Sequence, residues 1–328
     1  MLQDFGRIGV EERPQPTAGE GEVLIRTIAT GICGSDVHGY TGQNGRRHVG
    51  QVMGHETVGV VVGQGPGTDG TAAVGSVVTV NPQLRPGPGG GARVLGVNPE
   101  ISSAFAEYFV MPAENVVPLP VGMRVEHGAL VEPLAVGYHA AIRGEVAPGQ
   151  RVLVLGAGPI GLACVIAARR LGAGDILVSE PVPERRRRAA RLGAVVIDPF
   201  QEDVAAFCAR TGAVDVAIDA VGRSETIDAA LTSVRAGGRV SLVGMASPIV
   251  EIPAYSISVS ERRVVGSFCY TPEEFRETAA WASGEPALLD QLIDGRVTFD
   301  EADAAFSALA QDDASASKVL VYAEAIPA

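Results

Sequence analysis

Six consecutive residues, Gly156-Ala157-Gly158-Pro159-Ile160-Gly161, restrict the fold of this chain more than any other segment. They follow a short apolar run, Arg151–Leu155, and precede a helix that the spacing of apolar residues predicts over Ile160–Leu171. Glycines in this position permit a tight turn, close approach of a pyrophosphate and tight packing of the helix, whose free N–H groups meet the negative charge. The segment therefore predicts a dinucleotide site at Gly156, Gly158, Pro159, Ile160 and Gly161.

Strands and helices alternate after this segment. The pattern predicts further strands at Ile176–Ser179, Val214–Ile218, Val240–Val243 and Val264–Phe268, and further helices at Glu184–Leu192 and Thr226–Val234. Such alternation is typical of a doubly wound parallel sheet. We therefore expect an α/β fold for this half of the chain.

The earlier part of the chain has a different pattern. From Glu22 to Val80 it is rich in valine and broken by glycine, with short strands expected at Val58–Val62 and Val77–Val80. A chain of 328 residues is long enough for two domains. The C-terminal helices expected at Glu273–Ala282 and Glu301–Ala310, and a strand at Lys318–Tyr322, should return to the first domain. We place that β-rich domain at residues 1–133 with 271–328, and the cofactor domain at residues 134–270.

Composition excludes several classes of partner. The net charge is −12 and the only lysine is Lys318, so binding to nucleic acid or to an anionic membrane surface is disfavoured. No apolar run reaches membrane-spanning length, and Met1–Pro14 has no signal-peptide pattern. The cysteines are widely spaced, which argues against a disulfide framework. We expect a cytoplasmic protein that acts on a small molecule.

The acidic residue that should bind the cofactor ribose is Glu180. It lies at the end of the second strand of the cofactor domain, 19 residues after Gly161. A carboxylate there hydrogen-bonds the ribose hydroxyls and repels a 2′-phosphate, which favours NAD over NADP. Arg185, the first of four consecutive arginines, is the counter-evidence, because an arginine near the carboxylate could hold that phosphate. Its alternative interpretation is the solvated face of a helix.

Potential metal ligands occur at three places in the first domain. They are Cys33 with Asp36, then His55 with Glu56, and much later Glu132. Taken singly, each is an ordinary core or surface residue. Together they offer a thiolate, an imidazole and carboxylates, a donor set that suits Zn²⁺ with one position left open.

In this order and spacing, Cys-Gly-x-Asp-x-His (33–38), Gly-His-Glu-x-x-Gly (54–59), Glu-Pro-Leu (132–134) and the glycine segment resemble the zinc-containing medium-chain dehydrogenases. The nearest subgroup is the sorbitol, threonine and butanediol dehydrogenases, and the resemblance runs from about Gly21 to Val321. It implies a GroES-like catalytic domain beside a Rossmann domain. It also implies zinc-dependent oxidation of a secondary alcohol, in a polyol, vicinal diol or amino alcohol, with hydride transfer to NAD, and the reverse reaction.

The resemblance also assigns roles to residues. Cys33 and His55 would be zinc ligands, and Glu56 an adjoining ligand that binds or swings away. Glu132 would either ligate zinc or hold the metal-bound water. Asp36 would orient the histidine, as partners of metal ligands do; its alternative role is in a local turn.

A proton relay is implied at Ser35 and His38, where a hydroxyl beside the alcohol passes its proton through the cofactor ribose to an imidazole near solvent. Surface-loop residues are the alternative interpretation of both. The remaining histidines, His48, His127 and His139, fit no metal-ligand spacing and are expected to be structural.

Two departures from the family pattern affect the expectations. Many relatives carry four closely spaced cysteines that bind a structural zinc, but Asn81–Glu100 contains no cysteine, so that zinc should be absent. Sorbitol dehydrogenases carry an arginine between an aromatic residue and a tyrosine, where this chain has Phe268-Cys269-Tyr270. Without that donor, a smaller or less polar alcohol than sorbitol becomes more plausible, although Cys269 could equally be a packing residue.

Two rival functions are kept. One is a zinc-free NAD(P)H-dependent enone or quinone reductase, which would not need Cys33, His55 or Glu56. The other is a non-catalytic cofactor-binding protein, because fold does not fix function.

Relatives with this ligand set are dimers or tetramers that often pair the edge strand near Val264–Phe268, so we expect a homodimer or homotetramer.

Overall fold

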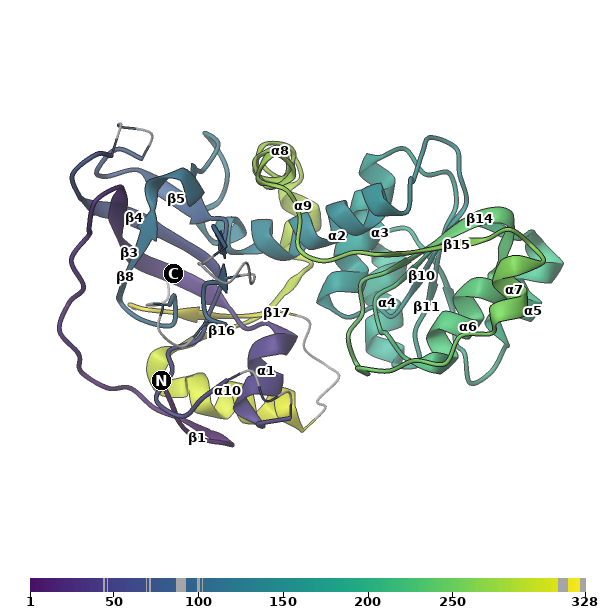
Figure 1. Ribbon diagram of the computed structural model, residues 1–328, viewed down its shortest axis with the longest axis horizontal. Coiled ribbons are helices and arrows are strands. Elements are labelled where there is room, and N and C mark those ends of the chain that lie inside the picture. Colours follow the sequence, from purple (N-terminus) through teal and green to yellow (C-terminus); the bar gives the residue numbers. More distant parts are fainter. Residues whose placement is uncertain are drawn as a thin grey trace. The chain divides into compact units, whose positions relative to one another are not determined.

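The computed structural model describes residues 1–43, 45, 47–68, 70, 72–86, 93–98, 101, 103–311 and 318–324 (Figure 1). The chain divides into two compact units, Met1–Glu132 with Phe275–Ala328, and Pro133–Glu274. From the sequence we expected domain boundaries after residues 133 and 270, whereas the two units divide after residues 132 and 274. Among the described helices, none combines the length and apolar character that crossing a membrane requires.

The second unit is built on the expected parallel sheet, and that prediction is confirmed. Six strands lie in the order β12-β11-β10-β13-β14-β15, and every neighbouring pair is parallel. Their bounds are β10 Val152–Leu155, β11 Ile176–Ser179, β12 Val195–Ile197, β13 Val214–Asp219, β14 Val234–Leu242 and β15 Arg263–Gly266. The helices are α3 Pro159–Arg170, α4 Pro183–Arg191, α5 Val204–Thr211, α6 Ser224–Ser233 and α7 Ala254–Ser258, and they flank the sheet in Figure 1.

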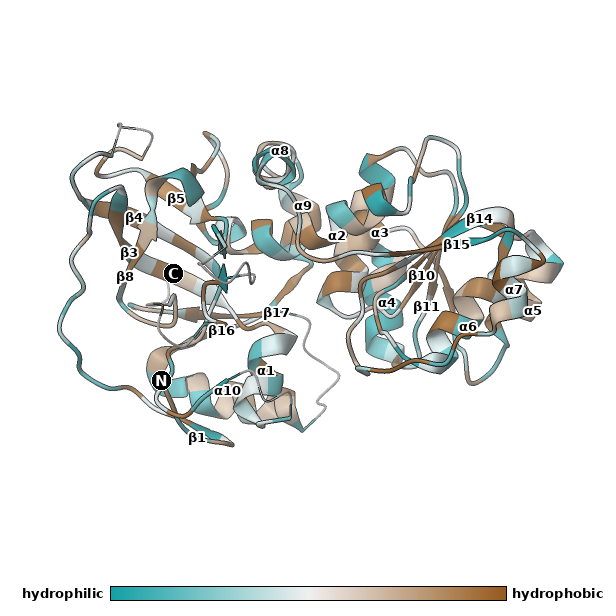
Figure 2. Cartoon of the chain, in the orientation of Figure 1, coloured by the Kyte–Doolittle hydropathy of each residue, from teal (hydrophilic) through white to brown (hydrophobic). Residues whose placement is uncertain are grey.

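Burial explains why these segments are strands and helices. Every residue of β10 and β11 is buried, as expected for strands covered on both faces, and Figure 2 shows them as apolar. Pro159 occupies the first turn of α3, where a missing N–H costs nothing. Asp203 caps α5 by accepting a hydrogen bond from the Ala206 N–H at 2.7 Å.

Two strand limits differ from the prediction. Val234, expected at the end of a helix, instead begins β14 and pairs with Val214, because this β-branched side chain is buried in the core. The last strand ends at Gly266, so Phe268 and Cys269 lie beyond it. Cys269 adopts φ 53°, a left-handed conformation that cannot continue a strand.

The first unit contains a seven-stranded sheet, which confirms its β-rich character. Its strands lie in the order β16-β17-β3-β4-β5-β9, and β8 pairs with β3. The bounds are β3 Glu22–Gly31, β4 Glu56–Gln64, β5 Val77–Val80, β8 Tyr108–Pro112, β9 Val116–Pro118, β16 Ile293–Thr298 and β17 Lys318–Tyr322. The C-terminal strand β17 pairs with β3, so the end of the chain returns to the first unit as expected.

Smaller elements complete this unit and the segments that join the two. Two-stranded pairs are formed by β1 Leu2–Asp4 with β2 Arg7–Ile8, and by β6 Gln83–Leu84 with β7 Arg93–Val94. The helices are α1 Gly34–Tyr40, η1 Ala113–Asn115, η2 Val125–Leu130, α2 Val131–Arg143, α8 Pro272–Ala282, α9 Pro286–Asp290, η3 Phe299–Glu301 and α10 Ala302–Ala310. Tyr40 of α1 packs on Phe306 of α10 with ring centroids 5.5 Å apart, which anchors α1.

Candidate metal centre and cofactor site

Three predicted ligands, Cys33, His55 and Glu56, lie together in the first unit. Their potential ligand atoms are all within 4.8 Å of one another. Cys33 precedes α1 just after β3, and Glu56 begins β4 opposite Gly31 of β3. The antiparallel pairing of β3 and β4 therefore brings the two sequence motifs to the same end of the sheet. His55 and Glu56 are buried, and Cys33 is half-buried.

Asp36 connects two parts of this group and is itself completely buried. Its Oδ2 accepts a hydrogen bond from the Cys33 backbone N–H at 3.3 Å, while Oδ1 faces His55 Nδ1 at 3.7 Å. The buried guanidinium of Arg47 lies 3.4 Å from the same Oδ1. Because Nδ1 faces Asp36, the other ring nitrogen of His55 is the one free to meet a metal.

The electrostatics of the group favour a cation. Burial opposes protonation of His55, but the negative charges of Asp36 and Cys33 outweigh it and raise the pKa of His55 to about 10. A site of this kind stabilises positive charge whether it is carried by a proton or by a metal ion. Binding of a metal would displace that proton from the imidazole.

An unsatisfied donor atom provides a second indication of a metal. Glu56 Oε1 is buried and has no hydrogen-bond partner among the described residues. Buried polar atoms rarely remain unpaired, because the loss of water costs free energy. Thiolate, imidazole and carboxylate together suit Zn²⁺. The residues present therefore fit a zinc ion.

A residue that sequence reasoning did not assign to the site lies beside these donors. Lys318, at the start of β17, is 2% exposed and its Nζ forms an ion pair with Glu56 Oε2. Burial lowers the pKa of Lys318, but Glu56 and Cys33 raise it, and the net shift is upward, so the ammonium is retained. Lys318 is the only lysine of the chain, which could have drawn attention to it. No pattern in the sequence, however, predicts that it pairs with Glu56.

Glu132 is buried at the start of α2 but is not within the 4.8 Å group. Its negative charge nevertheless contributes to the upward pKa shifts of His55 and Lys318, so it lies near them. Ser35 and His38 are both on α1, three residues apart. Ser35 is half-buried and His38 is exposed, so exposure to solvent increases from Ser35 to His38.

The glycine segment has the geometry that its sequence predicts. Gly156 has φ 90°, and a Cβ on Gly161 would lie 2.0 Å from the Gly156 carbonyl oxygen. Gly158 is the N-cap of α3 and has open space around it, where a phosphate could approach. Pro159 and Ile160 form the first turn of that helix.

Glu180 follows β11 and is 3% exposed. Its carboxylate accepts hydrogen bonds from the backbone N–H groups of Ala157, at 2.7 Å, and Val182, at 2.9 Å. The acidic side chain is thereby fixed beside the glycine segment, although 23 residues separate it from Ala157. This is the arrangement expected of a ribose-binding carboxylate.

The neighbouring arginines differ in their surroundings. Arg186, which was not singled out from the sequence, donates to the carbonyls of Glu180 and Pro181 and pairs with Asp198 at 2.8 Å. Arg185 is half-buried, and its Nε has no hydrogen-bond partner among the described residues. The charge of Arg186 is therefore engaged by neighbouring groups to a greater extent than the charge of Arg185.

A second group of potential ligands, Glu126, His127 and Asp290, lies in the first unit. Its carboxylates are already paired: Glu126 with Arg296 and Arg124, and Asp290 with Arg124 and with His127 at 2.8 Å. These arginines supply the positive charge that a metal would bring, so the group is better explained as an ion-pair network. His139 similarly contacts Glu274 at 2.8 Å, and His48 is exposed.

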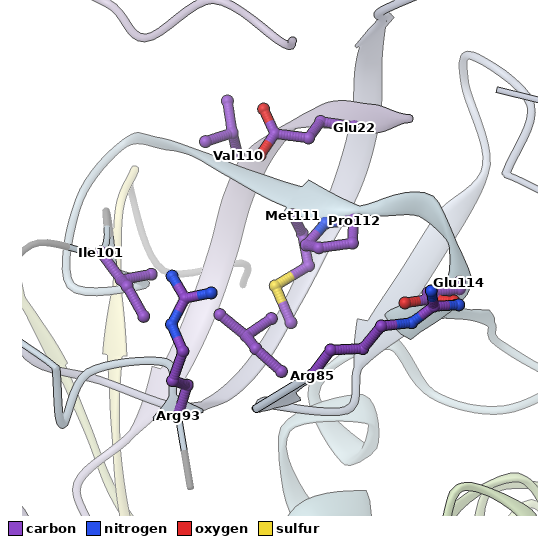
Figure 3. Close-up of a pocket in the computed structure, with 9 residues that line it drawn as sticks. Glu22, Arg85, Arg93, Ile101, Val110, Met111, Pro112 and Glu114 are labelled. Carbon is purple, nitrogen blue, oxygen red and sulfur yellow. The ribbon is translucent and has the colours of Figure 1, made fainter. Parts of the chain in front are cut away.

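A pocket of about 290 Å³ lies elsewhere in the first unit (Figure 3). It is lined by Glu22, Leu84, Arg85, Arg93, Ile101, Val110, Met111, Pro112 and Glu114. None of the candidate ligands lines it. Within Asn81–Glu100, the range in which the sequence lacks the cysteines of a structural zinc, residues 87–92, 99 and 100 lie outside the described residues.

Comparison with known proteins supports the same combination of domains. The family model of the alcohol dehydrogenase GroES-like domain matches residues 19–121, and that of the zinc-binding dehydrogenases matches residues 159–284. The chain is 33% identical to sorbitol dehydrogenase of Bacillus subtilis over 98% of this chain and 96% of the relative.

Solved structures agree with this similarity. The 2R,3R-butanediol dehydrogenase of Bacillus subtilis superposes with a TM-score of 0.88 at 30% identity, covering 97% of each chain. A Sinorhizobium meliloti protein assigned as a zinc-binding dehydrogenase and bound to NADP superposes with a TM-score of 0.89 at 31% identity, covering 98% of this chain and 97% of the other. The expected pairing of a GroES-like domain with a Rossmann-type domain is confirmed.

Proposed function

Since the chain belongs to the zinc-dependent medium-chain dehydrogenase family, we propose that it oxidises a secondary alcohol of a polyol, vicinal diol or amino alcohol to a ketone, with NAD as the hydride acceptor. The observation that carries this proposal is the buried group of Cys33, His55 and Glu56. A zinc-free reductase or a non-catalytic protein would not need these donors, and the comparisons lend support to neither rival.

Cys33 and His55 would hold the zinc ion, with Glu56 and Glu132 as the carboxylates at the same site. When bound, zinc would act as a Lewis acid toward the substrate hydroxyl, and NAD would accept the hydride. Asp36 would keep the His55 ring oriented, because it already faces Nδ1. His55 and Glu56 are buried whereas Cys33 is half-buried, so the donor group is reached from solvent at Cys33, as a catalytic rather than a structural site requires.

Proton release would use the two residues of α1. Ser35 would accept the proton of the alcohol, and His38 would release a proton to water. An imidazole suits the second role because it exchanges protons with water near neutral pH. The half-buried position of Ser35 and the exposure of His38 support this direction of transfer.

We propose NAD rather than NADP because the fixed carboxylate of Glu180 would bind ribose hydroxyls and repel a 2′-phosphate. Arg186 is already engaged by Asp198 and two carbonyl oxygens, which leaves Arg185 as the only nearby candidate of the two for holding that phosphate. One solved relative binds NADP, so the fold itself does not exclude that cofactor.

We also propose a single zinc ion per chain and a substrate that is smaller or less polar than sorbitol. Asn81–Glu100 has no cysteine to bind a structural zinc. Beyond the end of β15, Cys269 offers no strong hydrogen-bond donor where sorbitol dehydrogenases carry an arginine. The four cysteines of the chain all lie among the described residues and form no disulfide, which supports a reducing compartment such as the cytoplasm.

The test is NADH formation by the purified protein with a panel of vicinal diols, polyols and amino alcohols. We expect turnover with at least one class, lost on chelation of zinc and regained when zinc is restored. Turnover that survives complete removal of zinc would reject the proposal in favour of the zinc-free reductase.

A further inference from the structure

The chain has one lysine, and it is buried against the candidate metal ligands. Lys318 is 2% exposed, and its Nζ donates to the Ile32 carbonyl oxygen at 3.0 Å as well as to Glu56 Oε2. Lysine is almost never buried unless it is paired. A buried position for the only lysine therefore indicates a specific task for its charge.

The strand order explains how residues so far apart in sequence meet. Strands β17, β3 and β4 are consecutive neighbours, so the side chain from β17 must cross β3 to reach Glu56 on β4. It crosses at Gly31. A Cβ on Gly31 would lie 2.4 Å from Glu56 Oε2 and 3.2 Å from Lys318 Cδ, so only glycine leaves room for the pair.

The two oxygens of Glu56 have different surroundings. Oε2 is held by Lys318, whereas Oε1 is buried and has no hydrogen-bond partner among the described residues. The candidate donors Cys33 and His55 each place a potential ligand atom within 4.8 Å of one oxygen of this carboxylate. The ion pair thus divides the carboxylate into one oxygen that is engaged and one that is available.

We propose that Lys318 is a positioning residue that restrains Glu56 to offer a single oxygen to the metal, so that Glu56 remains exchangeable and the substrate position stays open. This inference rests on the proposed zinc-dependent function. Its physical basis is simple: without the ammonium, the buried carboxylate would have only the metal ion as its cationic partner.

The experiment compares the wild-type chain with Lys318→Met, which keeps the apolar stem, and Lys318→Arg, which keeps the charge. Each is loaded with Co²⁺ for visible spectroscopy and with Zn²⁺ for release measurements. In Lys318→Met we expect the rate of zinc dissociation to fall about tenfold or more, because Glu56 can then bind the ion with both oxygens. The cobalt absorption should also weaken, since binding of the second oxygen raises the coordination number. Lys318→Arg should resemble wild type, and wild-type release and spectrum in Lys318→Met would overturn the inference.

Two further measurements guard against a folding defect in the single variant. The double variant Lys318→Met with Glu56→Gln has no unpaired buried carboxylate, so its zinc release should match that of Glu56→Gln alone. In the wild-type protein, isotope-labelled lysine gives one side-chain NMR signal, which should shift when zinc is added to the metal-free chain. The inference is contradicted if zinc release from the double variant still differs from that of Glu56→Gln. It is also contradicted if the lysine signal does not shift when zinc is added.

These outcomes separate the two proposals. A wild-type chain that binds no zinc contradicts the proposed function and the inference together. A wild-type chain that binds zinc and turns over alcohol, while its lysine signal and the Lys318→Met variant are unaffected by the metal, contradicts only the role of Lys318.

Discussion

Asp36 illustrates how one side chain can serve two functions at the residue scale. The sequence left open a local turn or an orienting role toward the histidine. In the structure Oδ2 accepts from the Cys33 backbone, and Oδ1 faces His55. The local hydrogen bond shapes the start of α1, and Oδ1 lies beside the imidazole at 3.7 Å, so the two interpretations are compatible.

Cys33→Ala should abolish stoichiometric zinc binding, because it removes the only thiolate of the donor group. The measurement is zinc content by elemental analysis, with circular dichroism to confirm folding. Cys208→Ala is the matched control, since Cys208 is buried in the other unit and should leave zinc content unchanged. Full zinc in the Cys33 variant would refute the ligand assignment.

Glu180→Ala should shift cofactor preference toward NADP. Removal of the carboxylate takes away the ribose hydrogen bonds and the repulsion of the 2′-phosphate, so we expect kcat/KM with NAD to fall about tenfold. The ratio of kcat/KM for NADP to that for NAD is the readout. An unchanged ratio would show that Glu180 does not face the ribose, and Asp203→Ala serves as the control because that carboxylate only caps α5.

At the scale of elements, the turn between β10 and α3 depends on two glycines for different reasons. Gly161→Ala places a Cβ against the Gly156 carbonyl oxygen, whereas Gly158→Ala meets open space. The first variant should lose thermal stability and cofactor binding together. The second should fold normally and lose NAD affinity alone, because its methyl group occupies the phosphate approach. Calorimetry with and without NAD distinguishes them, and equal stability loss in both variants would contradict this explanation.

Glu126 connects η2 to β16 and β17. It accepts two hydrogen bonds from Arg296, at 2.8 and 2.9 Å, and one from Tyr322 at 2.8 Å. The Arg296 bonds lower the pKa of Glu126 to about 2 from its ordinary value of 4.5. Glu126→Gln should therefore destabilise the protein by about 1–2 kcal/mol at neutral pH, allowing for solvent screening.

The pH dependence follows from the lowered pKa. The carboxylate is protonated more readily in the unfolded chain than in the folded one, so its stabilisation is complete above pH 4.5 and is lost as pH falls toward 2. The difference in unfolding free energy between wild type and Glu126→Gln should shrink over that window in urea titrations. A difference that stays constant across it would refute the network.

Sequence patterns predicted most elements of the second unit, because buried parallel strands and their helices have strong periodicity. They failed where tertiary contacts decide the outcome, as at Val234, which joins β14 through its pairing with Val214. The candidate ligands were recognisable from their motifs. The Lys318–Glu56 pair was not, since it depends on the order of β17, β3 and β4 and on the missing side chain of Gly31.

At the scale of the whole molecule, exposed apolar residues of the second unit suggest self-association. Ile249, Tyr255 and Val259 are 81–86% exposed, and in the sequence they precede the edge strand β15. Exposed apolar residues and sheet edges are both common features of interfaces. We propose that a second copy of the chain covers these residues, giving a homodimer or, with a further interface, a homotetramer.

Val259→Arg tests this assembly. A buried, unpaired arginine in the interface should convert the oligomer to monomers, as measured by analytical ultracentrifugation. Val121→Arg is the control, because Val121 is fully exposed in the other unit. A wild-type chain that sediments as a monomer would reject the interface, as would an unchanged oligomer in Val259→Arg.

The central claim is that a single zinc ion is held by Cys33, His55 and Glu56. Zinc content per chain, determined by elemental analysis of protein produced in zinc-replete medium, tests it most directly. The account predicts about one zinc per chain, because one donor group suits the ion and no cysteine lobe is present. No bound zinc would contradict the metal site and the mechanism built on it, and two would contradict the absence of a structural zinc.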